Sequence, residues 1–482
     1  MTNRSDNLPV RNIVIVGGGI SGLSAAWFLE QAYAAKSDSV KITVLEDSSR
    51  FGGKIRTDTI DGFGVTPFIV EAGPDSFLTQ KPWALILARS VGLTSQILGT
   101  NDKVRNIFVL NKGKAMKLPE GVLLVVPTKM WPFITSPLIT IAGKLRMALD
   151  LILPAQRSKA DESLGCFVRR RFGTEALDKI AEPLMAGIYN ANADEQSILA
   201  TFPKFRDIER EHGSLIRGMI AQKLHPKPNA QPGPDHEPVS MFVSFKNGTE
   251  DIVTALCQHL KSDLRLNASV TTISTSQHTA GRFTVTLSDG TSLPADDVIL
   301  TCSAKIAAKL LTDVSPGSID NLNKIRYAST GTVAVGFRTE AIKRPIDGFG
   351  IVVPRSEKRP INAITVVSTK FSNRVPDGHT LLRVFFGGAR SPETMNLSDE
   401  SLISMVREQL HDLVGVEDTP LFTKIERWFG GNPLYDVHHL ELCDTIDASL
   451  PDGIWVTGCS YRGVGLPDCV HQSQQLIQRL VA

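Results

Sequence analysis

The sequence predicts an α/β fold built on a parallel sheet. Two short apolar runs, 12–16 and 41–45, are typical of buried parallel strands. Between them, apolar residues recur at helical spacing over 20–27, so the three segments form one strand–helix–strand unit. A further apolar strand begins at residue 454 and is followed by glycines and a helical C-terminus. Both ends of the chain therefore contribute to the expected α/β unit.

The composition excludes several classes of protein. The chain has 482 residues, of which 42% are hydrophobic, and this argues against a disordered or collagen-like chain. The 50 acidic and 52 basic residues nearly balance, which argues against a nucleic-acid-binding protein. Six scattered cysteines form no C-x-x-C pair, so neither a metal site nor a disulfide framework is indicated. The polar N-terminus has no apolar signal segment, and we expect a cytoplasmic protein.

A glycine fingerprint follows the first strand. Gly17, Gly19 and Gly22 form a G-x-G-x-x-G motif whose glycines allow a tight turn, a close approach to a pyrophosphate and close helix packing. The second strand ends at a carboxylate that can accept the ribose hydroxyls. The spacing exceeds the usual value of about 20 residues, and we attribute this to an extended helix and loop over 31–39. The expected dinucleotide contacts are Gly17, Gly18, Gly19, Ile20, Ser21, Gly22, Glu46 and Asp47. The alternative is a glycine-rich turn in an unrelated α/β fold.

Two further segments point to FAD and not to NAD. Residues 50–54 (RFGGK) resemble the R-x-G-G motif of the glutathione-reductase-like and amine-oxidase-like flavoproteins, in which the chain passes close to the flavin phosphates. A lysine replaces the usual final arginine, which keeps the charge but loses the forked geometry. The glycine segment over 458–468 resembles the one that closes over the isoalloxazine in that superfamily. The resemblance adds Gly53, Lys54, Gly458, Val464, Gly465 and Leu466 to the cofactor contacts. The alternative for the first motif is a simple surface turn.

Longer motifs resemble the protoporphyrinogen oxidase family over essentially the whole chain. They are 71–77 (EAGPDSF), 187–189 (GIY), 200–205 (ATFPKF) and 461–469 (YRGVGLPDC). The resemblance is closest to the Gram-positive-type branch, many of whose members oxidise coproporphyrinogen III. That branch has a lysine shortly after GPDSF, which Lys81 matches. The arginine that the plant and animal branch places before a Phe-Val-Leu segment is absent before Phe108, although Arg105 is near.

The resemblance implies a six-electron oxidation of a porphyrinogen of haem biosynthesis in three flavin cycles. Each cycle passes two electrons to O2 and yields hydrogen peroxide. The implied step is hydride loss from a meso CH2 group to flavin N5, with loss of a pyrrole N–H proton. The cofactor then carries the chemistry, while the protein supplies orientation and a dry pocket. Whether the substrate is coproporphyrinogen III or protoporphyrinogen IX stays open, although four propionates favour a more basic pocket than two.

The resemblance also assigns roles to single residues. Gly73, Pro74, Asp75 and Ser76 are expected beside the flavin. Asp75 is the candidate catalytic residue, because a carboxylate can accept a pyrrole N–H and hold developing positive charge. The plainer alternative for Asp75 is a hydrogen-bond acceptor within the loop.

Other assignments concern the substrate and the outer parts of the cofactor. Lys81 matches a propionate partner, and Val352 and Val367 fall where the family sandwiches the macrocycle. Val270 matches a backbone contact to adenine, and Trp428 matches a residue near the flavin. The alternatives are a solvated surface lysine for Lys81 and ordinary core positions for the valines and the tryptophan.

The expected architecture is a two-dinucleotide-binding, Rossmann-like FAD fold with a mixed-sheet substrate domain and an inserted α-helical, membrane-facing domain. The FAD domain is expected over 10–68, 239–304 and 440–482, the substrate domain over 69–90, 190–238 and 305–439, and the helical domain over 91–189. Strand-like runs between 326 and 430 predict a mostly antiparallel sheet over a pocket, and the prolines of 225–238 predict an exposed loop.

A membrane-facing surface is expected within 117–159. This stretch is too broken by proline to span a bilayer, but it carries apolar residues beside basic ones and can lie in the interface. The apolar residues are Leu123, Leu124, Trp131, Phe133, Ile139 and Leu145. The alternative is a helical domain whose apolar face packs internally or on a second subunit. The expected partners are a porphyrinogen, O2, a membrane surface and a second copy of the chain, with no nucleic acid.

The sequence leaves two rival functions open. One is an oxidase of amines or carotenoid precursors, in which a flavin-linked cysteine often occurs near the C-terminal motif. Cys459 lies close to that position, but the motif continues as Tyr461-Arg462-Gly463, unlike those enzymes. The other is a non-enzymatic binder such as the GDP dissociation inhibitors, which lack the flavin-closing segment.

Overall fold

Three distant segments of the chain build one parallel sheet. The computed structural model describes residues 10–36, 39–123, 126–127, 129–224, 240–276 and 281–482. Its five-stranded parallel sheet has the order β12-β2-β1-β16-β22. The strands are β1 (Arg11–Val16), β2 (Val40–Leu45), β12 (Asp263–Arg265), β16 (Asp297–Leu300) and β22 (Ile454–Val456). The expected contribution of both chain ends to this sheet is confirmed.

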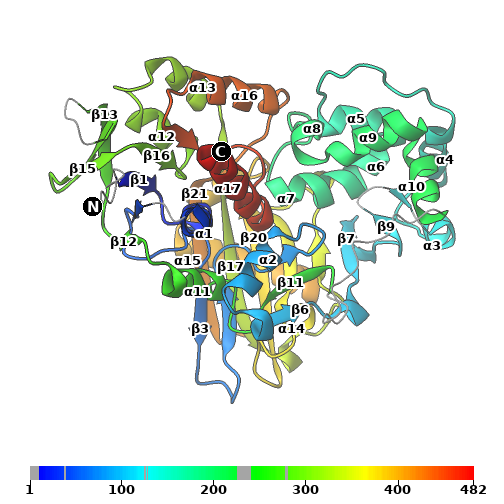
Figure 1. The fold of residues 1–482 in the computed structure, drawn as a ribbon. Helices are drawn as coiled ribbons and strands as arrows, with labels where there is room; N and C mark the ends of the chain where they lie inside the picture. The colour runs from blue at the N-terminus through cyan, green and yellow to red at the C-terminus, as the bar shows by residue number, and fades with distance from the viewer. Residues whose placement is uncertain (1–9, 37–38, 124–125, 128, 225–239, 277–280) are drawn as a thin grey trace, which may run out of the picture.

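The two faces of this sheet are covered by different layers. Ile13 and Ile15 point toward α1 (Ile20–Lys36) and α17 (Leu466–Val481), which pack side by side (Figure 1). Val14 and Val16 point to the other side, because successive side chains of a strand alternate. There they meet α12 (Ala304–Leu310) and the antiparallel sheet of β13 (Val270–Thr275), β14 (Phe283–Leu287) and β15 (Ser292–Ala295). The expected long first helix is present through Lys36, and residues 37–38 lie outside the described part.

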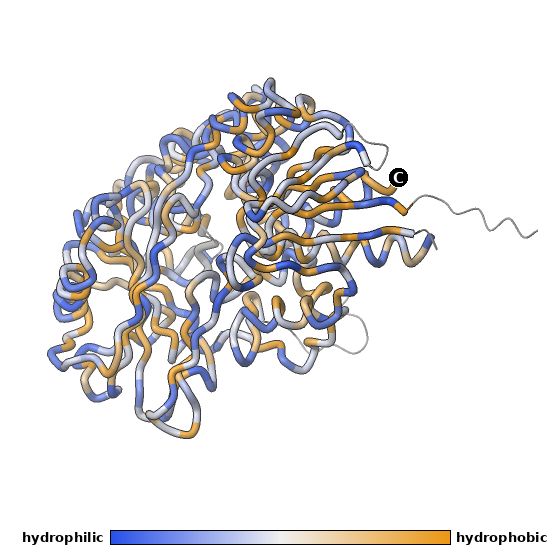
Figure 2. The backbone as a smooth tube through the Cα atoms, turned by 90° about the vertical axis from the view of Figure 1, so that its left-hand side faces the viewer, coloured by the Kyte–Doolittle hydropathy of each residue, from blue (hydrophilic) through white to orange (hydrophobic). Residues whose placement is uncertain are grey.

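A second large sheet has seven strands, and most of its strand pairs are antiparallel. Its order is β21-β17-β20-β19-β18-β7-β8, and only the β18–β7 pair is parallel. The strands are β21 (Phe422–Pro433), β17 (Tyr327–Arg338), β20 (His379–Gly387), β19 (Ile361–Val366), β18 (Gly350–Val352), β7 (Ile107–Asn111) and β8 (Lys114–Lys117). The helix α15 (Asp399–Val414) packs on this sheet through an apolar cluster. Figure 2 shows hydrophobic stretches gathered in the sheets and helices and hydrophilic segments at many turns.

A helical lobe lies beside the sheets, on the right of Figure 1. Its helices are α3 (Met130–Thr135), α4 (Ile141–Ala148), α5 (Leu164–Phe172), α6 (Thr174–Ala176), the π-helix η4 (Leu177–Ala186), α7 (Gly187–Tyr189), α8 (Ile198–Thr201), α9 (Pro203–His212) and α10 (Leu215–Leu224). They share one apolar core, which includes Phe167, Ile180 and Ile216. Among the described residues, no helix is both long and apolar enough to cross a bilayer.

The stretch 91–189, expected to form the helical domain, contains strands as well as helices. The strands β7 and β8 belong to the seven-stranded sheet, while α9 and α10 join the core of the lobe although they lie beyond residue 189. Helical periodicity identifies the helices but does not say which core they enter. The proline-rich stretch 225–238 lies outside the described residues.

A buried ion pair joins the layers near the start of the 71–77 motif. Glu71 ends β4 (Phe68–Glu71), which pairs with β3 (Thr57–Ile60). Arg374 NH1 lies 2.9 Å from Glu71 Oε1, and the two side chains are 0% and 3% exposed. The same guanidinium donates to Ser244 Oγ at 2.7 Å and to Phe245 O at 2.5 Å. Both acceptors belong to β11 (Phe242–Phe245), which lies between β5 (Phe77–Leu78) and β6 (Ile97–Gly99).

Replacing Arg374 with methionine should destabilise the fold strongly. The change leaves Glu71 buried without its cation, and losing one partner of a buried pair costs about 3–5 kcal/mol. Thermal unfolding followed by calorimetry measures the effect. The control Lys129→Met removes a pair whose side chains are 59% and 60% exposed, and it should cost less than about 1 kcal/mol. Equal melting temperatures for the two variants would contradict the assigned role of the buried pair.

Candidate active site

The glycine turn between β1 and α1 has the shape of a phosphate cradle. Gly17 has φ of +109°. A Cβ atom on Gly22 would lie 1.9 Å from Gly17 O, so only glycine fits at the third position. A Cβ atom on Gly19 would meet nothing within 4 Å, which leaves open space at the start of α1. Exposed backbone amides and the helix dipole favour an anion at such a position.

The carboxylate expected to bind the ribose is fixed next to this turn. Glu46 Oε2 accepts a hydrogen bond from Gly18 N at 2.7 Å, and Glu46 Oε1 accepts from Ser48 Oγ, also at 2.7 Å. The backbone oxygen of Glu46 accepts from Ala268 N, two residues before Val270. The start of β13 therefore lies beside the end of β2, where the adenine contact of Val270 was expected.

The RFGGK turn packs directly on the glycine fingerprint. Gly52 N donates to Gly18 O at 2.8 Å, and Gly19 and Gly52 form a parallel bridge. Gly53 has φ of +57°, and a Cβ atom there would lie 3.5 Å from the Cα of Gly19. The two motifs are therefore one structural unit.

The C-terminal glycine segment reaches the same place from the far end of the chain. Gly458 has φ of +113°, and a Cβ atom there would lie 3.3 Å from Ser21 Oγ. Ser473 Oγ on α17 donates to Ser21 O at 2.9 Å. Tyr435 pins the segment from behind, because its hydroxyl donates to Cys459 O at 2.6 Å and accepts from Gly463 N at 2.8 Å. The sequence gives no motif signal for Tyr435.

The loop after β4 packs against the RFGGK turn. A Cβ atom on Gly73 would lie 1.9 Å from Lys54 O, so this contact requires glycine. Three successive carbonyls of the loop accept side-chain hydrogen bonds from distant strands or turns: Ala72 O from Trp428 Nε1 at 2.9 Å, Gly73 O from Arg383 NH2 at 2.7 Å, and Pro74 O from Thr249 Oγ1 at 2.9 Å. The loop is therefore held rigidly at the cofactor motif.

Asp75 in this loop is paired with one cation and lies near a second. Lys370 Nζ lies 2.7 Å and 2.8 Å from the two carboxylate oxygens, and Ser76 Oγ donates to Asp75 Oδ1 at 2.7 Å. Burial alone raises the pKa of the Asp75 carboxyl, but the charges of Lys370 and Arg383 outweigh burial and hold that pKa well below its usual range. Asp75 is therefore an anion at neutral pH.

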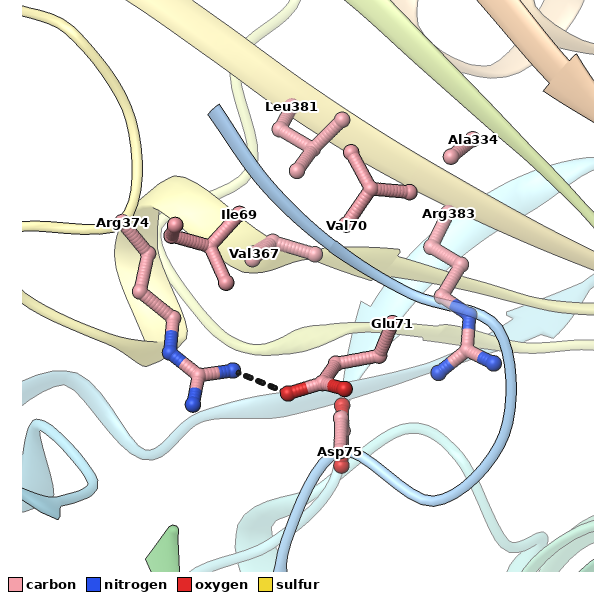
Figure 3. Close-up of a pocket in the computed structure, with 9 residues that line it drawn as sticks. All are labelled: Ile69, Val70, Glu71, Asp75, Ala334, Val367, Arg374, Leu381 and Arg383. Atoms are coloured by element: carbon pink, nitrogen blue, oxygen red, sulfur yellow. Dashed lines mark hydrogen bonds and ion pairs between the residues drawn. The ribbon is translucent and has the colours of Figure 1, made fainter. Parts of the chain in front are cut away.

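A small cavity lies beside the loop (Figure 3). Its volume is about 10 Å³, which is enough for about one water molecule. It is lined by Ile69, Val70, Glu71, Asp75, Ala334, Val367, Arg374, Leu381 and Arg383. Figure 3 shows the Arg383 guanidinium pointing toward the Glu71 and Asp75 carboxylates. The cavity is too small for a tetrapyrrole.

The residues expected at the substrate are not all brought together. Val352 packs against the core of the helical lobe, whereas Val367 begins α14 (Val367–Lys370) and lies in a separate apolar cluster at the small cavity. Val352 pairs with Ala363 in the sheet, four residues before Val367. A position of these two valines on either side of a bound macrocycle stays a prediction. Lys81 binds both carboxylate oxygens of Asp468 at 2.7 Å, and its side chain is 42% exposed.

Comparisons with known proteins place the chain in a family. The family model described as flavin-containing amine oxidoreductase matches residues 20–474. The chain belongs to this family. It is 34% identical to a coproporphyrinogen III oxidase of Bacillus subtilis over 97% of each chain, and 29% identical to a chloroplastic protoporphyrinogen oxidase of Nicotiana tabacum, covering 96% of this chain and 84% of the relative. A crystal structure of a candidate protoporphyrinogen oxidase from Exiguobacterium superposes with a TM-score of 0.84, at 32% identity over 98% of each chain.

Membership of this flavoprotein family confirms the prediction of FAD as cofactor. The described residues fit FAD, because the open space at Gly19 and the carboxylate of Glu46 lie next to each other at the start of α1. Gly53, Lys54, Gly73 and Gly458 all lie around the same turn. Sequence reasoning missed Lys370, Arg383 and Arg374, which lie outside every motif and reach the site only through the folded sheet.

The substitution Gly22→Ala should abolish FAD binding. A Cβ atom 1.9 Å from Gly17 O forces the turn and α1 apart, which disrupts the phosphate cradle. The ratio of flavin absorbance at about 450 nm to protein absorbance at 280 nm after purification measures occupancy. The matched control is Gly317→Ala, where a Cβ atom meets nothing within 4 Å, and it should keep the wild-type ratio. A fully loaded Gly22→Ala protein would show that the cofactor binds elsewhere.

Proposed function

We propose that the protein is a porphyrinogen oxidase of haem biosynthesis that passes electrons from the substrate through FAD to O2, with hydrogen peroxide as the second product. The observation that carries this is the rigid 71–77 loop, in which Gly73 packs on the cofactor-binding turn and the ionised Asp75 follows two residues later. The names of relatives that span nearly the whole chain support the substrate class. Bound FAD would accept a hydride from a meso CH2 group of the porphyrinogen.

The chain's own residues orient the substrate. Trp428, Arg383 and Thr249 fix the carbonyls of Ala72, Gly73 and Pro74, so the loop cannot adapt when substrate binds. Asp75 accepts a pyrrole N–H and offsets the positive charge that the ring acquires as hydride leaves. Such prearranged charge needs no reorganisation during the reaction.

Coproporphyrinogen III is the favoured substrate. Lys81 is half-exposed and uses Asp468 as its partner, so it remains within reach of a second carboxylate at the surface of the site. An ammonium has three N–H donors, and two of them are directed at Asp468. The extra propionates of coproporphyrinogen III give Lys81 more acceptors than protoporphyrinogen IX does.

The test follows porphyrin fluorescence in air with each porphyrinogen separately, after subtraction of the uncatalysed rate. We expect faster turnover of coproporphyrinogen III. The change Lys81→Met should raise KM for coproporphyrinogen III by about tenfold, the loss of one charge-assisted hydrogen bond, and should affect protoporphyrinogen IX less. A bound flavin with no turnover of either compound would refute the proposal. Amines and carotenoid precursors would then be the next substrates to test.

The helical lobe carries a surface that we propose contacts a membrane. Trp131, Ile141, Leu145 and Ile152 have exposed fractions between 66% and 78% and belong to α3, α4 or the turn after them. Exposed basic residues follow this surface at 157 and 159. Aromatic and apolar side chains beside basic ones suit the interface of an anionic bilayer. Phe133 and Ile139, expected on this surface, are instead buried in the core of the lobe, and Leu124 lies outside the described residues.

The double change Trp131→Ser and Ile141→Ser should weaken membrane binding. Co-flotation of the protein with vesicles of phosphatidylglycerol and phosphatidylcholine measures the bound fraction, and we expect the variant to lose most of it. The control Val65→Ser alters a fully exposed apolar residue at a distant turn and should leave flotation unchanged. Equal flotation of the double variant and the wild type would exclude this surface as the contact.

A further inference from the structure

Lys370 ends α14 and has no donor left for a substrate. Its ammonium lies 2.7 Å from Asp75 Oδ1, 2.8 Å from Asp75 Oδ2 and 3.0 Å from Ser76 Oγ. An ammonium has three N–H donors, so these three acceptors saturate it. The side chain is only 14% exposed and packs over the Phe371 ring at 5.2 Å. Lys370 is therefore unsuited to bind a propionate, in contrast to Lys81.

Asp75, in contrast, keeps one acceptor position free. A carboxylate has about four lone-pair positions, two on each oxygen. Ser76 and Lys370 use both positions of Oδ1, and Lys370 uses one position of Oδ2. The side chain is 15% exposed, so a ligand can reach it. One N–H donor from a substrate would complete the shell of Oδ2.

The charges around Asp75 come from several elements. Lys370 faces it from α14 and Arg383 faces it from β20. Across the small cavity lie Glu71 at the end of β4 and its partner Arg374. Arg383 is 4% exposed, and its Nε atom has no hydrogen-bond partner within the described part of the chain. Three cations thus surround two carboxylates.

We infer that Lys370 is a positioning residue that keeps Asp75 ionised and aims its free Oδ2 acceptor at a substrate N–H. This rests on the proposed function. Asp75 then holds the pyrrole through a hydrogen bond and never takes up its proton, which passes to water. The pKa of Asp75, lowered by Lys370 and Arg383 against the effect of burial, agrees with a residue that does not titrate during turnover.

The first test compares pH profiles of kcat/KM between pH 5.5 and 8.5. The wild type should show no acid limb from Asp75. The change Lys370→Met leaves a buried carboxylate with a weaker cation field, so its pKa rises and kcat/KM should fall about tenfold per unit of pH below that pKa. Lys370→Arg should restore the flat profile, since a guanidinium can bind both carboxylate oxygens. The surface control Lys309→Met should match the wild type.

The second test needs no substrate. In the wild type, the depressed pKa of Asp75 gives stability that is present above its unfolded pKa of about 3.9 and is lost only at lower pH. In Lys370→Met, the raised folded pKa gives stability that is lost as the pH rises through it. The difference in melting temperature between wild type and Lys370→Met should therefore be larger at pH 8 than at pH 5.5, by about 2 °C or more. Adding Asp75→Asn to Lys370→Met should remove this pH dependence.

The outcomes separate the two proposals. An acid limb in the wild type that Asp75→Asn removes would show that Asp75 takes up the proton and would overturn the inference. A Lys370→Met variant whose melting-temperature difference is the same at both pH values would show that Lys370 does not set the ionisation of Asp75. Absence of porphyrinogen turnover at every pH would refute the proposed function alone, because the melting measurements still decide whether Lys370 controls Asp75.

Discussion

The arrangement of the site depends on the buried ion pair between Arg374 and Glu71. Two charges withdrawn from water are costly unless they are paired and hydrogen-bonded. The two terminal nitrogens of Arg374 bind Glu71, Ser244 Oγ and Phe245 O, and its buried Nε atom has no hydrogen-bond partner among the described residues. The Glu71 carboxylate also accepts hydrogen bonds from Thr57 and Thr249. The pair therefore ties β4 to β11 and fixes the point from which the 71–77 loop starts.

From that fixed point, the loop is held by groups that are not its neighbours in sequence. Buried backbone carbonyls must find donors, and here Trp428, Arg383 and Thr249 supply them. The loop carries little regular structure of its own, yet its carbonyls and its aspartate have fixed partners. Preorganisation at this site is consequently a property of the seven-stranded sheet and of the turn before α11 (Asp251–His259), and not of the loop sequence alone.

Sequence patterns predicted the strands of the cofactor sheet well and the packing partners of other segments less well. The strands expected at 12–16, at 41–45 and from residue 454 are local apolar runs, and the structure has β1, β2 and β22 there. The stretch 107–117 lies next to helices in sequence, but it pairs with β18, which lies more than 200 residues later. Phe133 and Ile139 were expected on the membrane-facing surface, but both are buried in the core of the helical lobe. The sheet or core that a segment joins depends on the surface against which it packs, and the hydrophobic periodicity of the segment does not identify that surface.

The sequence by itself determined the dinucleotide fold, because one local turn requires glycine at Gly17 and Gly22, and the G-x-G-x-x-G spacing is therefore visible in the sequence. It also determined the family, through motifs that are each contiguous. Only the tertiary structure decided the state of Asp75, because Lys370 lies 295 residues away from it along the chain. The ionisation of a buried carboxylate is set by the charges within a few ångströms of it, and those charges come together only when the sheet, α14 and the loop pack against one another.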